Sequence, residues 1–519
     1  MSEFYRANIL RFDEGTRRYQ LHDLLQEFAD ARLMDEELGA AQLRHAQYYL
    51  QVAAYSDQLY LEGKVLEGLA LFDREWEHIK AGQAWAAENL ETNDDAAKLC
   101  NKFPSASIEC LDLRLAPREK VSWLEIGATA ARQLNQHADE GGHLSNLGVM
   151  YRELGDAHKS IEHLTQSLAI SREIGNRRGE GNALGNLGSA YLQLGEARKA
   201  IQYCEQSLAI TREIGDRRGE GASLGNLGSA HAYLGDARRA IEFYEQVLPL
   251  AREIGDIRSE ATVLGNLGQQ YFHLGEARKA IDVYEQALKI SREIGDKDGE
   301  GILLVALGNG FAFFGEARKA IDVYEQALKI SREIGDKDGE GNELGNLGNA
   351  YLQLGDAHKA TEFYEQALAI SREIGDKRLE ANILLQLGST ILRFDLGDEQ
   401  AEKYLRESDA LCDEIEYKLG KIGVSFALGS LAYVQNRDEE ARKIFNDAFR
   451  MAQEIESRPM IAAITLFRAP LEGTVLGQDE ATRLALEARS AFAEMGMNVI
   501  DEKYFAQLLE MFSKGEFPE

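Results

Sequence analysis

Proline and cysteine are scarce in this chain. Six of the 519 residues are proline, about 1% against a usual share near 5%, which rules out Pro-rich disordered and collagen-like chains. The four cysteines, Cys100, Cys110, Cys204 and Cys412, form no Cys-x-x-Cys pair and have no histidine at metal spacing. We therefore expect reduced, mostly buried thiols, no disulfide scaffold and no metal site.

Positive charge is also in short supply. Lysine and arginine number 58 against 87 aspartate and glutamate residues, which gives a formal net charge of −29. Because such a surface repels phosphate groups, we expect neither nucleic acid nor a membrane as a partner. The sequence contains no apolar run of about eighteen residues and no basic segment followed by an apolar one at its start. It therefore predicts a cytoplasmic protein without a transmembrane helix.

Catalytic and cofactor motifs are missing as well. No Gly-x-x-x-x-Gly-Lys-Ser/Thr phosphate loop occurs, so a nucleotide has no strong site in this chain. The segment 179–185 imitates a dinucleotide fingerprint, but it follows a helical pattern and recurs along the chain, which is typical of packing glycine. The abundant acidic residues repeat with a fixed period, whereas catalytic carboxylates occur once. We predict no enzyme and no cofactor.

A forty-residue repeat organises most of the sequence. The segment Gly275 to Glu300 recurs letter for letter from Gly315 to Glu340, and close variants begin at 155, 195, 235 and 355. Within a unit, apolar residues fall at helical spacing in two stretches that a Leu-Gly turn separates. Such a period predicts helix pairs that bury their apolar faces only by stacking on their neighbours.

The Leu-Gly, Tyr, Gly, Ala and Tyr/Phe pattern of these units resembles the tetratricopeptide repeat (TPR), in the forty-residue form of kinesin light chains and Leu-Gly-Asn repeat proteins. The resemblance covers roughly residues 140–497. It implies an all-α, right-handed superhelical TPR solenoid that binds a protein or peptide ligand in its concave groove. The predicted domains are a winged-helix remnant (1–35), a helical linker (36–95), the superhelix of about nine repeats plus one degenerate (96–497), and a capping helix with a tail (498–519).

The N-terminal segment 9–33 differs from the repeats. It predicts a short β-hairpin followed by a helix, and it resembles the winged-helix end of STAND signalling ATPases of the NB-ARC type. The Met-His-Asp signature of that family appears here as Leu21-His22-Asp23. The resemblance implies that His22 senses nucleotide when an upstream NTPase domain is present. The alternative is that His22 and Asp23 merely cap the helix.

One stripe of the repeats is rich in side-chain amides. In tetratricopeptide repeats the positions i, i+4, i+7 and i+11 of each first helix line the concave face, and we call these positions the amide stripe. An amide offers both a donor and an acceptor, so the stripe predicts capture of an extended peptide through its backbone. The predicted peptide-binding residues are Asn182, Asn186, Ser189, Gln193, Asn226, Ser229, Tyr233, Asn266, Gln269, His273, Asn309, Phe313, Asn342, Asn346, Asn349, Gln353 and Arg393.

An equally weighted alternative applies to four of these amides. Near-identical repeats copy every consensus residue, so the asparagines at one position of the stripe could instead bond the neighbouring helix; they are Asn186, Asn226, Asn266 and Asn346. The last position of the stripe discriminates better, because it varies between units. Tyr233, His273, Phe313 and Arg393 replace Gln193 and Gln353 there, as side-chain pockets for a particular ligand would require.

Together these patterns favour a protein-binding module, namely the sensor arm of a STAND-type ATPase. The rival hypothesis is a free-standing TPR scaffold or adaptor that bridges protein partners and has no ATPase.

Overall fold

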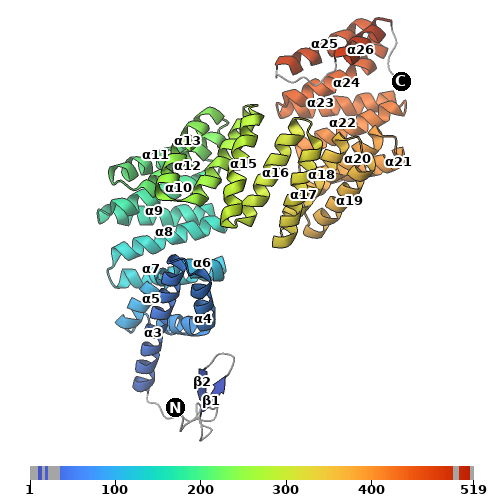
Figure 1. The fold of residues 1–519 in the computed structure, drawn as a ribbon. Coiled ribbons are helices and arrows are strands. Elements are labelled where there is room, and N and C mark those ends of the chain that lie inside the picture. The colour runs from blue at the N-terminus through green and yellow to red at the C-terminus, as the bar shows by residue number, and fades with distance from the viewer. Residues whose placement is uncertain (1–9, 14–17, 22–34, 495–501, 515–519) are drawn as a thin grey trace. The chain divides into compact units, whose positions relative to one another are not determined.

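The computed structural model describes residues 10–13, 18–21, 35–494 and 502–514 (Figure 1). The chain divides into two compact units, Met1–Gln270 and Tyr271–Glu519. This division falls inside a helix and coincides with none of the domain boundaries expected from the sequence, which stay predictions.

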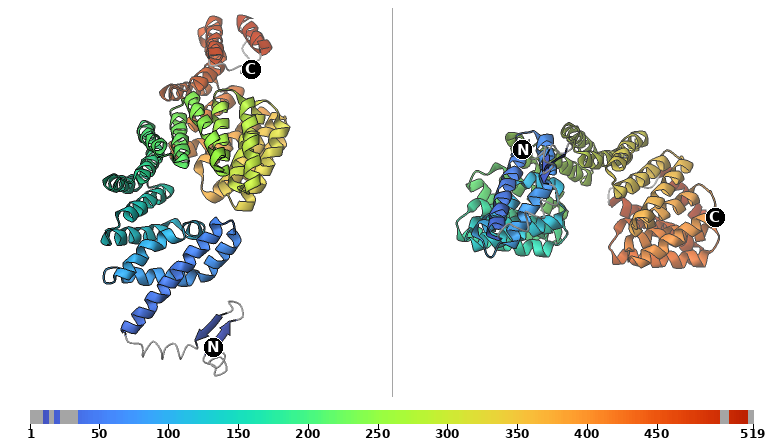
Figure 2. Two further views of the ribbon diagram at one scale, coloured as in Figure 1. Left: turned by 60° about the vertical axis from the view of Figure 1, so that its left-hand side comes forward. Right: turned by 90° about the horizontal axis from the view of Figure 1, so that it is seen from below.

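The first unit consists of helices that follow one another at short turns, and from α7 to α13 each helix packs against its predecessor or, for α7, against α5 (Figures 1 and 2). Its helices are α3 (Asp35–Leu61), α4 (Val65–Glu88), α5 (Asp94–Ala106), α6 (Ile108–Arg114), α7 (Pro117–Gln133), α8 (His137–Glu153), α9 (Ala157–Glu173), α10 (Arg177–Gln193), α11 (Ala197–Glu213), α12 (Arg217–Tyr233), α13 (Ala237–Ile254) and α14 (Ile257–His273), whose last three residues belong to the second unit.

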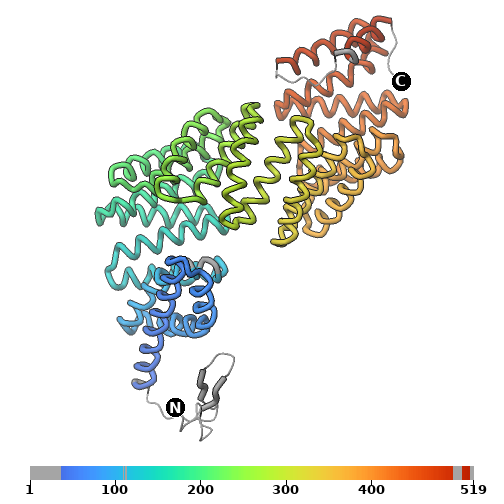
Figure 3. The backbone as a smooth tube through the Cα atoms, in the orientation of Figure 1, coloured from blue at the N-terminus to red at the C-terminus, as the bar shows by residue number. Residues whose placement is uncertain are grey.

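The second unit continues the same pattern of paired helices, which the tube of Figure 3 shows without side chains. Its helices are α15 (Ala277–Ile294), α16 (Lys297–Phe313), α17 (Ala317–Ile334), α18 (Lys337–Gln353), α19 (Ala357–Ile374), α20 (Lys377–Arg393), α21 (Asp398–Glu414), α22 (Lys418–Val434), α23 (Asp438–Glu454), α24 (Arg458–Leu476), α25 (Gln478–Glu494) and α26 (Glu502–Lys514). The predicted all-α solenoid of helix pairs is confirmed.

The structure supports less of the prediction for the N-terminal segment. Strands β1 (Leu10–Asp13) and β2 (Arg18–Leu21) pair antiparallel, with Leu10 opposite Leu21. A two-stranded ribbon of this size has no core of its own, and the expected helix after it lies outside the described residues. The structure therefore does not support the winged-helix remnant that the sequence predicts.

Each repeat begins and ends for local reasons. An aspartate such as Asp336 caps the first helix by accepting a hydrogen bond from the backbone N–H of Gly339, at 3.0 Å. The preceding helix, α17, ends at Ile334, and Gly335 directly after it has a φ of 77°, a left-handed conformation that favours glycine. Both residues belong to the repeated sequence, so the turn between units is copied along with the helices.

Ion pairs tie each turn to the next helix. Glu340, whose side chain is 8% exposed, lies 2.7 Å from the Nε of Arg332 and 2.8 Å from the Nζ of Lys337. Two hydrogen bonds lower the pKa of the Glu340 carboxyl: the one from Lys337 contributes most, and the one from Arg332 contributes next. Glu300 has the same arrangement one repeat earlier, with Arg292 and Lys297.

The Leu-Gly pair inside a first helix, such as Leu307-Gly308, has a glycine that lets the two helices of a repeat approach closely. In α16 the ring of Tyr324 lies over Gly308, where an added Cβ would come within 2.3 Å of the tyrosine Cε1. Tyr324 itself is 2% exposed. By contrast, a Cβ on Gly301, in the same helix, would meet only the Cγ2 of Ile330 at 3.7 Å, an ordinary contact.

We expect Gly308→Ala to lower the free energy of unfolding by about 1–3 kcal/mol, because the added methyl group overpacks the Tyr324 contact. Gly301→Ala is the control in the same helix and should be neutral or stabilising by up to about 1 kcal/mol, since alanine is the better helix former. Urea unfolding of the two variants checks this. A harmless Gly308→Ala would contradict the close-approach argument.

One buried carboxyl group interrupts the apolar contacts of the second unit. Glu343 is 3% exposed, and its Oε1 accepts a hydrogen bond from the Ser331 hydroxyl at 2.9 Å, whereas Oε2 has no partner. Leu303 occupies the equivalent position one repeat earlier, after an identical segment. Burial raises the pKa of Glu343 to about 7; the Ser331 hydrogen bond opposes this rise, and the nearby Asp336 adds to it.

The raised pKa predicts that stability falls as the pH rises. Between about pH 4.5 and 7 the folded Glu343 holds a proton that the unfolded chain has lost, so unfolding becomes easier across this window and stays easier above it. We expect Glu343→Leu to remove a pH-dependent cost of at most about 3 kcal/mol. Thermal melts of both proteins at pH 5 and pH 8 measure the effect.

Glu325→Leu, at an exposed position of α17, is the control and should leave the pH dependence unchanged. Identical pH dependence in the Glu343→Leu variant and the unmodified chain would contradict the prediction.

Helix α24 is the one helix in the described part of the chain that is long and apolar enough, by length and composition alone, to cross a membrane. It packs against α25, and its buried side chains include Ala462, Ile464, Ala469 and Leu471. Arg468 and Glu472 form an ion pair on it at 3.3 Å. These contacts are typical of a core helix of the array.

Candidate functional site

All seventeen predicted peptide-binding residues lie on first helices of the repeats, from α10 to α20, and each is exposed or half-buried. Seven of them, from Asn182 to Tyr233, belong to α10 and α12 of the first unit. Asn266 and Gln269 are on the part of α14 that belongs to the first unit, and His273 is on the part that belongs to the second. His22 lies outside the described residues, so its role as a nucleotide sensor stays a prediction.

A cleft in the second unit brings six of the predicted residues together. It has a volume of about 600 Å³ and is lined from α16, α18 and α20 by Asn309, Phe313, Asn346, Asn349, Gln353 and Arg393. Asn342, although on α18, does not line the cleft; its amide donates to the carbonyl of Asp338 at 2.9 Å. The varied last position of the stripe thus contributes three different side chains to one cleft.

Sequence reasoning missed two aromatic residues of the cleft, Phe272 and Tyr324. Phe272 adjoins the stripe position at His273, and the ring of Phe272 meets that of Phe313 edge-on at 5.6 Å. Tyr324 comes from the second helix, where its repeat position predicts a core residue. Its ring is in the core, but its hydroxyl passes between the helices to the stripe.

Tyrosine hydroxyls orient two of the amides. Tyr324 donates a hydrogen bond to the Oδ1 of Asn309 at 2.7 Å, and Tyr364 does the same to Asn349 at 2.7 Å. Burial raises the pKa of Tyr324 to about 12, so the hydroxyl keeps its proton near neutral pH. Because Oδ1 is the acceptor in both pairs, the NH₂ groups of Asn309 and Asn349 remain available as donors to a ligand.

The amides of the stripe differ in how far they are already bonded. Asn226 donates to the carbonyl of Gly185 in the neighbouring first helix at 3.3 Å. This contact is the one that the consensus alternative describes. Within the described residues no intramolecular hydrogen bond involves the side chain of Asn346, although it occupies the same position of its repeat. Gln353 makes only a long bond of 3.4 Å to the carbonyl of Ala312.

The cleft contains a cation without an anion. The guanidinium of Arg393 lies 5.7 Å from the ring of Phe394, and none of the residues that line the cleft is acidic. Phe313, at 63% exposure, is among the most exposed large apolar side chains of the described chain. The cleft therefore offers amide donors, one positive charge and an exposed aromatic ring.

Metal and thiol chemistry find no support among the residues that the structure describes. No group of three or more His, Cys, Asp or Glu side chains there could hold a metal ion. All four cysteines are buried, and burial raises the pKa of the Cys204 thiol to about 12. A thiol with such a pKa is a poor nucleophile.

Comparison with known families identifies the repeat. The tetratricopeptide repeat model matches residues 139–213, 180–253, 259–333 and 342–408. A second model, of anaphase-promoting complex subunit 5, matches residues 393–472. No curated protein matches the chain.

Solved structures share the fold at low sequence identity. A signal transduction ATPase with numerous domains (STAND) and a tetratricopeptide repeat sensor, from Pyrococcus horikoshii, is 18% identical over 81% of this chain, with a TM-score of 0.55. This chain spans 60% of the length of that protein. The apo quorum sensor NprR from B. thuringiensis is 13% identical over 70% of this chain and 99% of its own, with a TM-score of 0.50.

The different bonding of Asn226 and Asn346 leads to a stability prediction. Asn226→Ala removes the hydrogen bond to Gly185 and should lower the free energy of unfolding by about 0.5–1.5 kcal/mol. Asn346→Ala removes no intramolecular bond and should leave stability almost unchanged, or raise it slightly. Thermal melts of the two single variants compare them directly; equal losses would contradict the assignment of Asn346 as an amide available to a ligand.

Proposed function

The chain is a tetratricopeptide-repeat protein, and we propose that it captures an extended segment of a partner protein or peptide in the cleft of its second unit. We further propose that it acts as the cytoplasmic sensor arm of a STAND-type ATPase. The single observation that supports capture is the cleft lined by α16, α18 and α20, whose amides face an open space and are incompletely bonded.

The chemistry of the cleft suits a peptide backbone better than a small polar metabolite. The NH₂ groups of Asn309 and Asn349 are held in place by tyrosines, so they can donate to successive carbonyl groups of an extended strand. Asn346 lies on α18 beside them and supplies both a donor and an acceptor. Phe313 adds exposed apolar surface, which in interfaces is typical of an anchoring residue.

Two observations support the STAND context. The Leu21-His22-Asp23 string resembles the signature at the winged-helix end of NB-ARC-type ATPases. The solved STAND protein with a tetratricopeptide repeat sensor shares the fold of 81% of this chain. An upstream NTPase domain is then the second proposed partner, after the ligand of the cleft.

A free-standing scaffold is the alternative, and one observation favours it: these 519 residues contain no phosphate loop. The two proposals differ in the ADP binding that they predict when an upstream ATPase segment is present. By calorimetry the chain alone should not bind ADP, because His22 without a phosphate loop supplies one weak contact. If an ATPase segment encoded in frame upstream confers ADP binding that His22→Ala weakens, the sensor proposal is supported; no effect of His22→Ala supports the scaffold.

Capture itself is tested with a partner retained by the immobilised chain, identified by mass spectrometry and then titrated. We expect Asn346→Ala to weaken binding about two- to thirteenfold, the equivalent of one neutral hydrogen bond. Phe313→Ala should weaken it further, because an exposed aromatic ring in an interface is a common anchor.

The matched control is Gln366→Ala, on the second helix α19, where the exposed amide bonds only the carbonyl of Glu362 in its own helix. It should bind as the unmodified chain does. Unchanged affinity in both Asn346→Ala and Phe313→Ala would refute capture by this cleft.

A further inference from the structure

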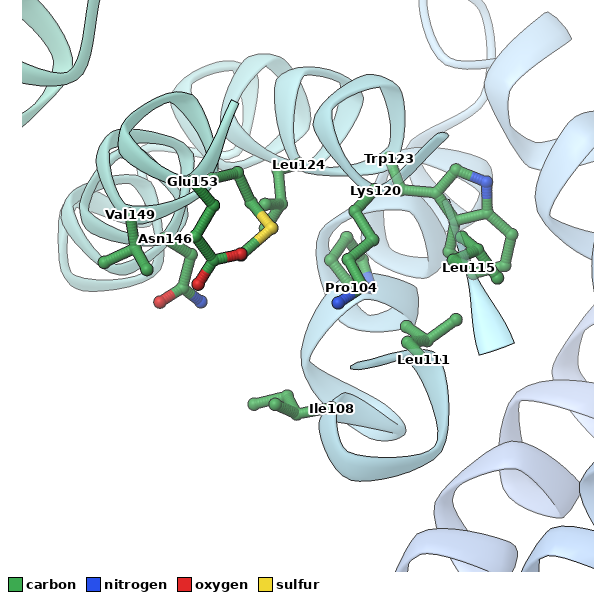
Figure 4. A pocket seen from close by; sticks show the side chains of 11 residues that line it. Pro104, Ile108, Leu111, Leu115, Lys120, Trp123, Leu124, Asn146, Val149 and Glu153 are labelled. Atoms are coloured by element: carbon green, nitrogen blue, oxygen red, sulfur yellow. The ribbon is translucent and has the colours of Figure 1, made fainter. Parts of the chain in front are cut away.

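The enclosed pocket of the first unit carries side chains of both charges. It has a volume of about 190 Å³ where α5, α6, α7 and α8 meet, and Lys120 and Glu153 line it together with apolar side chains (Figure 4). Its charges therefore favour neither an acidic nor a basic ligand. The amide stripe of the second unit is different, because the one cation of its cleft has no acidic neighbour there.

Arg393 offers an unpaired positive charge at the last position of the stripe. It is exposed, and among the described residues it forms no ion pair and no hydrogen bond; its guanidinium lies 5.7 Å from the ring of Phe394. Two amides of the same cleft, Asn309 and Asn349, already accept hydrogen bonds from tyrosine hydroxyls and have only donors left. The cleft thus presents mainly donors, which match an ionised carboxylate, a group that only accepts.

The stripe becomes apolar after Arg393. Allowing for one extra residue in the turn between α20 and α21, Val434 of α22 occupies the same position as Arg393, and Phe467 of α24 occupies the position of Asn346. Val434 is 66% exposed and Phe467 is 46% exposed. The ring of Phe467 meets that of Phe426 edge-on at 4.7 Å. We call Phe426, Val434 and Phe467 the apolar section; exposed apolar side chains gathered in this way are typical of a binding surface.

The spacing of the helices suits one extended segment. Helix α20 contacts α22, and α22 contacts α24, all within the second unit. The axes of packed helices lie about 8–10 Å apart. In the polyproline II conformation, side chains three residues apart face the same side at a separation of about 9 Å. A segment in this conformation can therefore present one side chain to Arg393 and another, three residues away, to Val434.

An acidic side chain suits Arg393 better than a chain end. The stripe continues on both sides of Arg393, to α18 in one direction and to α22 in the other. A segment that follows the stripe therefore passes Arg393 and has no reason to end there. The carboxylate of an aspartate or glutamate can accept two parallel hydrogen bonds from the guanidinium, the strong form of this pair.

We propose that the ligand segment of the second unit carries an aspartate or glutamate that pairs with Arg393, and a large apolar residue three positions away that packs on Val434 and Phe467. On the other side of Arg393 the amides of the cleft bond the backbone of the segment. This inference rests on the proposed peptide capture, to which it adds the chemistry of the captured segment.

The test measures binding of short peptides to the full chain by fluorine-19 NMR. The probe is acetyl-Gln-Asp-Gln-Gln-Phe-Gln-amide with 4-fluorophenylalanine as its aromatic residue, and the same peptide with Asp and Phe exchanged covers the opposite chain direction. Salt is kept at about 0.15 M, where charges more than about 8 Å apart are largely screened, so that the net charge of −29 repels the acidic probe little. We expect saturable broadening of the fluorine signal for one of the two probes.

Unlabelled competitors separate the two parts of the motif. With asparagine in place of aspartate, the peptide should compete about two- to fivefold less well, the effect of one exposed ion pair. With alanine in place of phenylalanine, it should compete about three- to twelvefold less well, as expected when half of a large apolar side chain is buried.

Variants of the chain assign each part to its residue. Arg393→Gln should abolish the preference for aspartate over asparagine, and Arg393→Glu should reverse it in favour of a lysine peptide. Val434→Ser should weaken the phenylalanine peptide but not the alanine peptide, and Phe467→Ser should do the same; Val434 is the safer change, because Phe467 also packs on Phe426. The matched control is Leu486→Ser on the second helix α25, which is as exposed as Phe467 and should bind as the unmodified chain does.

Several outcomes would overturn the proposal. One is binding of neither probe, and another is an aspartate preference that survives Arg393→Gln. Binding of acetyl-Phe-Gln-Gln-Gly with a free carboxylate, but of neither probe, would show that Arg393 binds a chain end. Self-association of the chain that Phe467→Ser abolishes would show that the apolar section is an interface between copies.

The failure of this inference is distinguishable from the failure of peptide capture. Peptides that bind with no preference for an acidic or apolar residue, and that Asn346→Ala weakens, would refute the motif and leave capture by the cleft intact. A retained partner whose affinity neither Asn346→Ala nor Phe313→Ala changes would refute capture itself.

Discussion

The close approach of tyrosine to glycine within a helix pair is the contact on which both the core and the cleft depend. Gly308 and Gly348 have no side chain, so the rings of Tyr324 and Tyr364 can lie directly on the backbone of the facing helix. Only at this short separation do the tyrosine hydroxyls emerge on the far side and reach Asn309 and Asn349. The same contact that buries the ring therefore fixes the orientation of a side chain that faces solvent.

Identical residues at one repeat position do not make identical contacts. Asn226 and Asn346 occupy one repeat position, yet the first bonds a neighbouring helix and the second has its amide available. The difference arises from the neighbours rather than from the residue itself. Conversely, Phe313 and Arg393 occupy one repeat position and differ in chemistry. The cleft therefore differs from the rest of the array mainly at this variable last position of the amide stripe.

Much of the fold could be predicted from the sequence, because a fixed period imposes the same helix pair each time. A Gly-Asp pair such as Gly335 and Asp336 marks the turn in five successive copies. The residues of the cleft were predicted in part. Asn346 and Arg393 follow from helical spacing, whereas Tyr324 does not, because spacing assigns it to the core and says nothing of how far a long side chain extends. The N-terminal winged helix is the prediction that the structure does not support, and short strands carry too little periodicity to specify what packs on them.

The segments Gly275–Glu300 and Gly315–Glu340 are the same in every letter, and each carries its own turn and its own ion pairs between arginine, lysine and glutamate. A junction made by joining the end of one copy to the start of the next is therefore chemically complete wherever it occurs. Unequal recombination within the gene would add or delete whole helix pairs without exposing an unsatisfied cap or a lone charge. The length of the binding surface can thus evolve in steps of one repeat, independently of the residues that give it specificity.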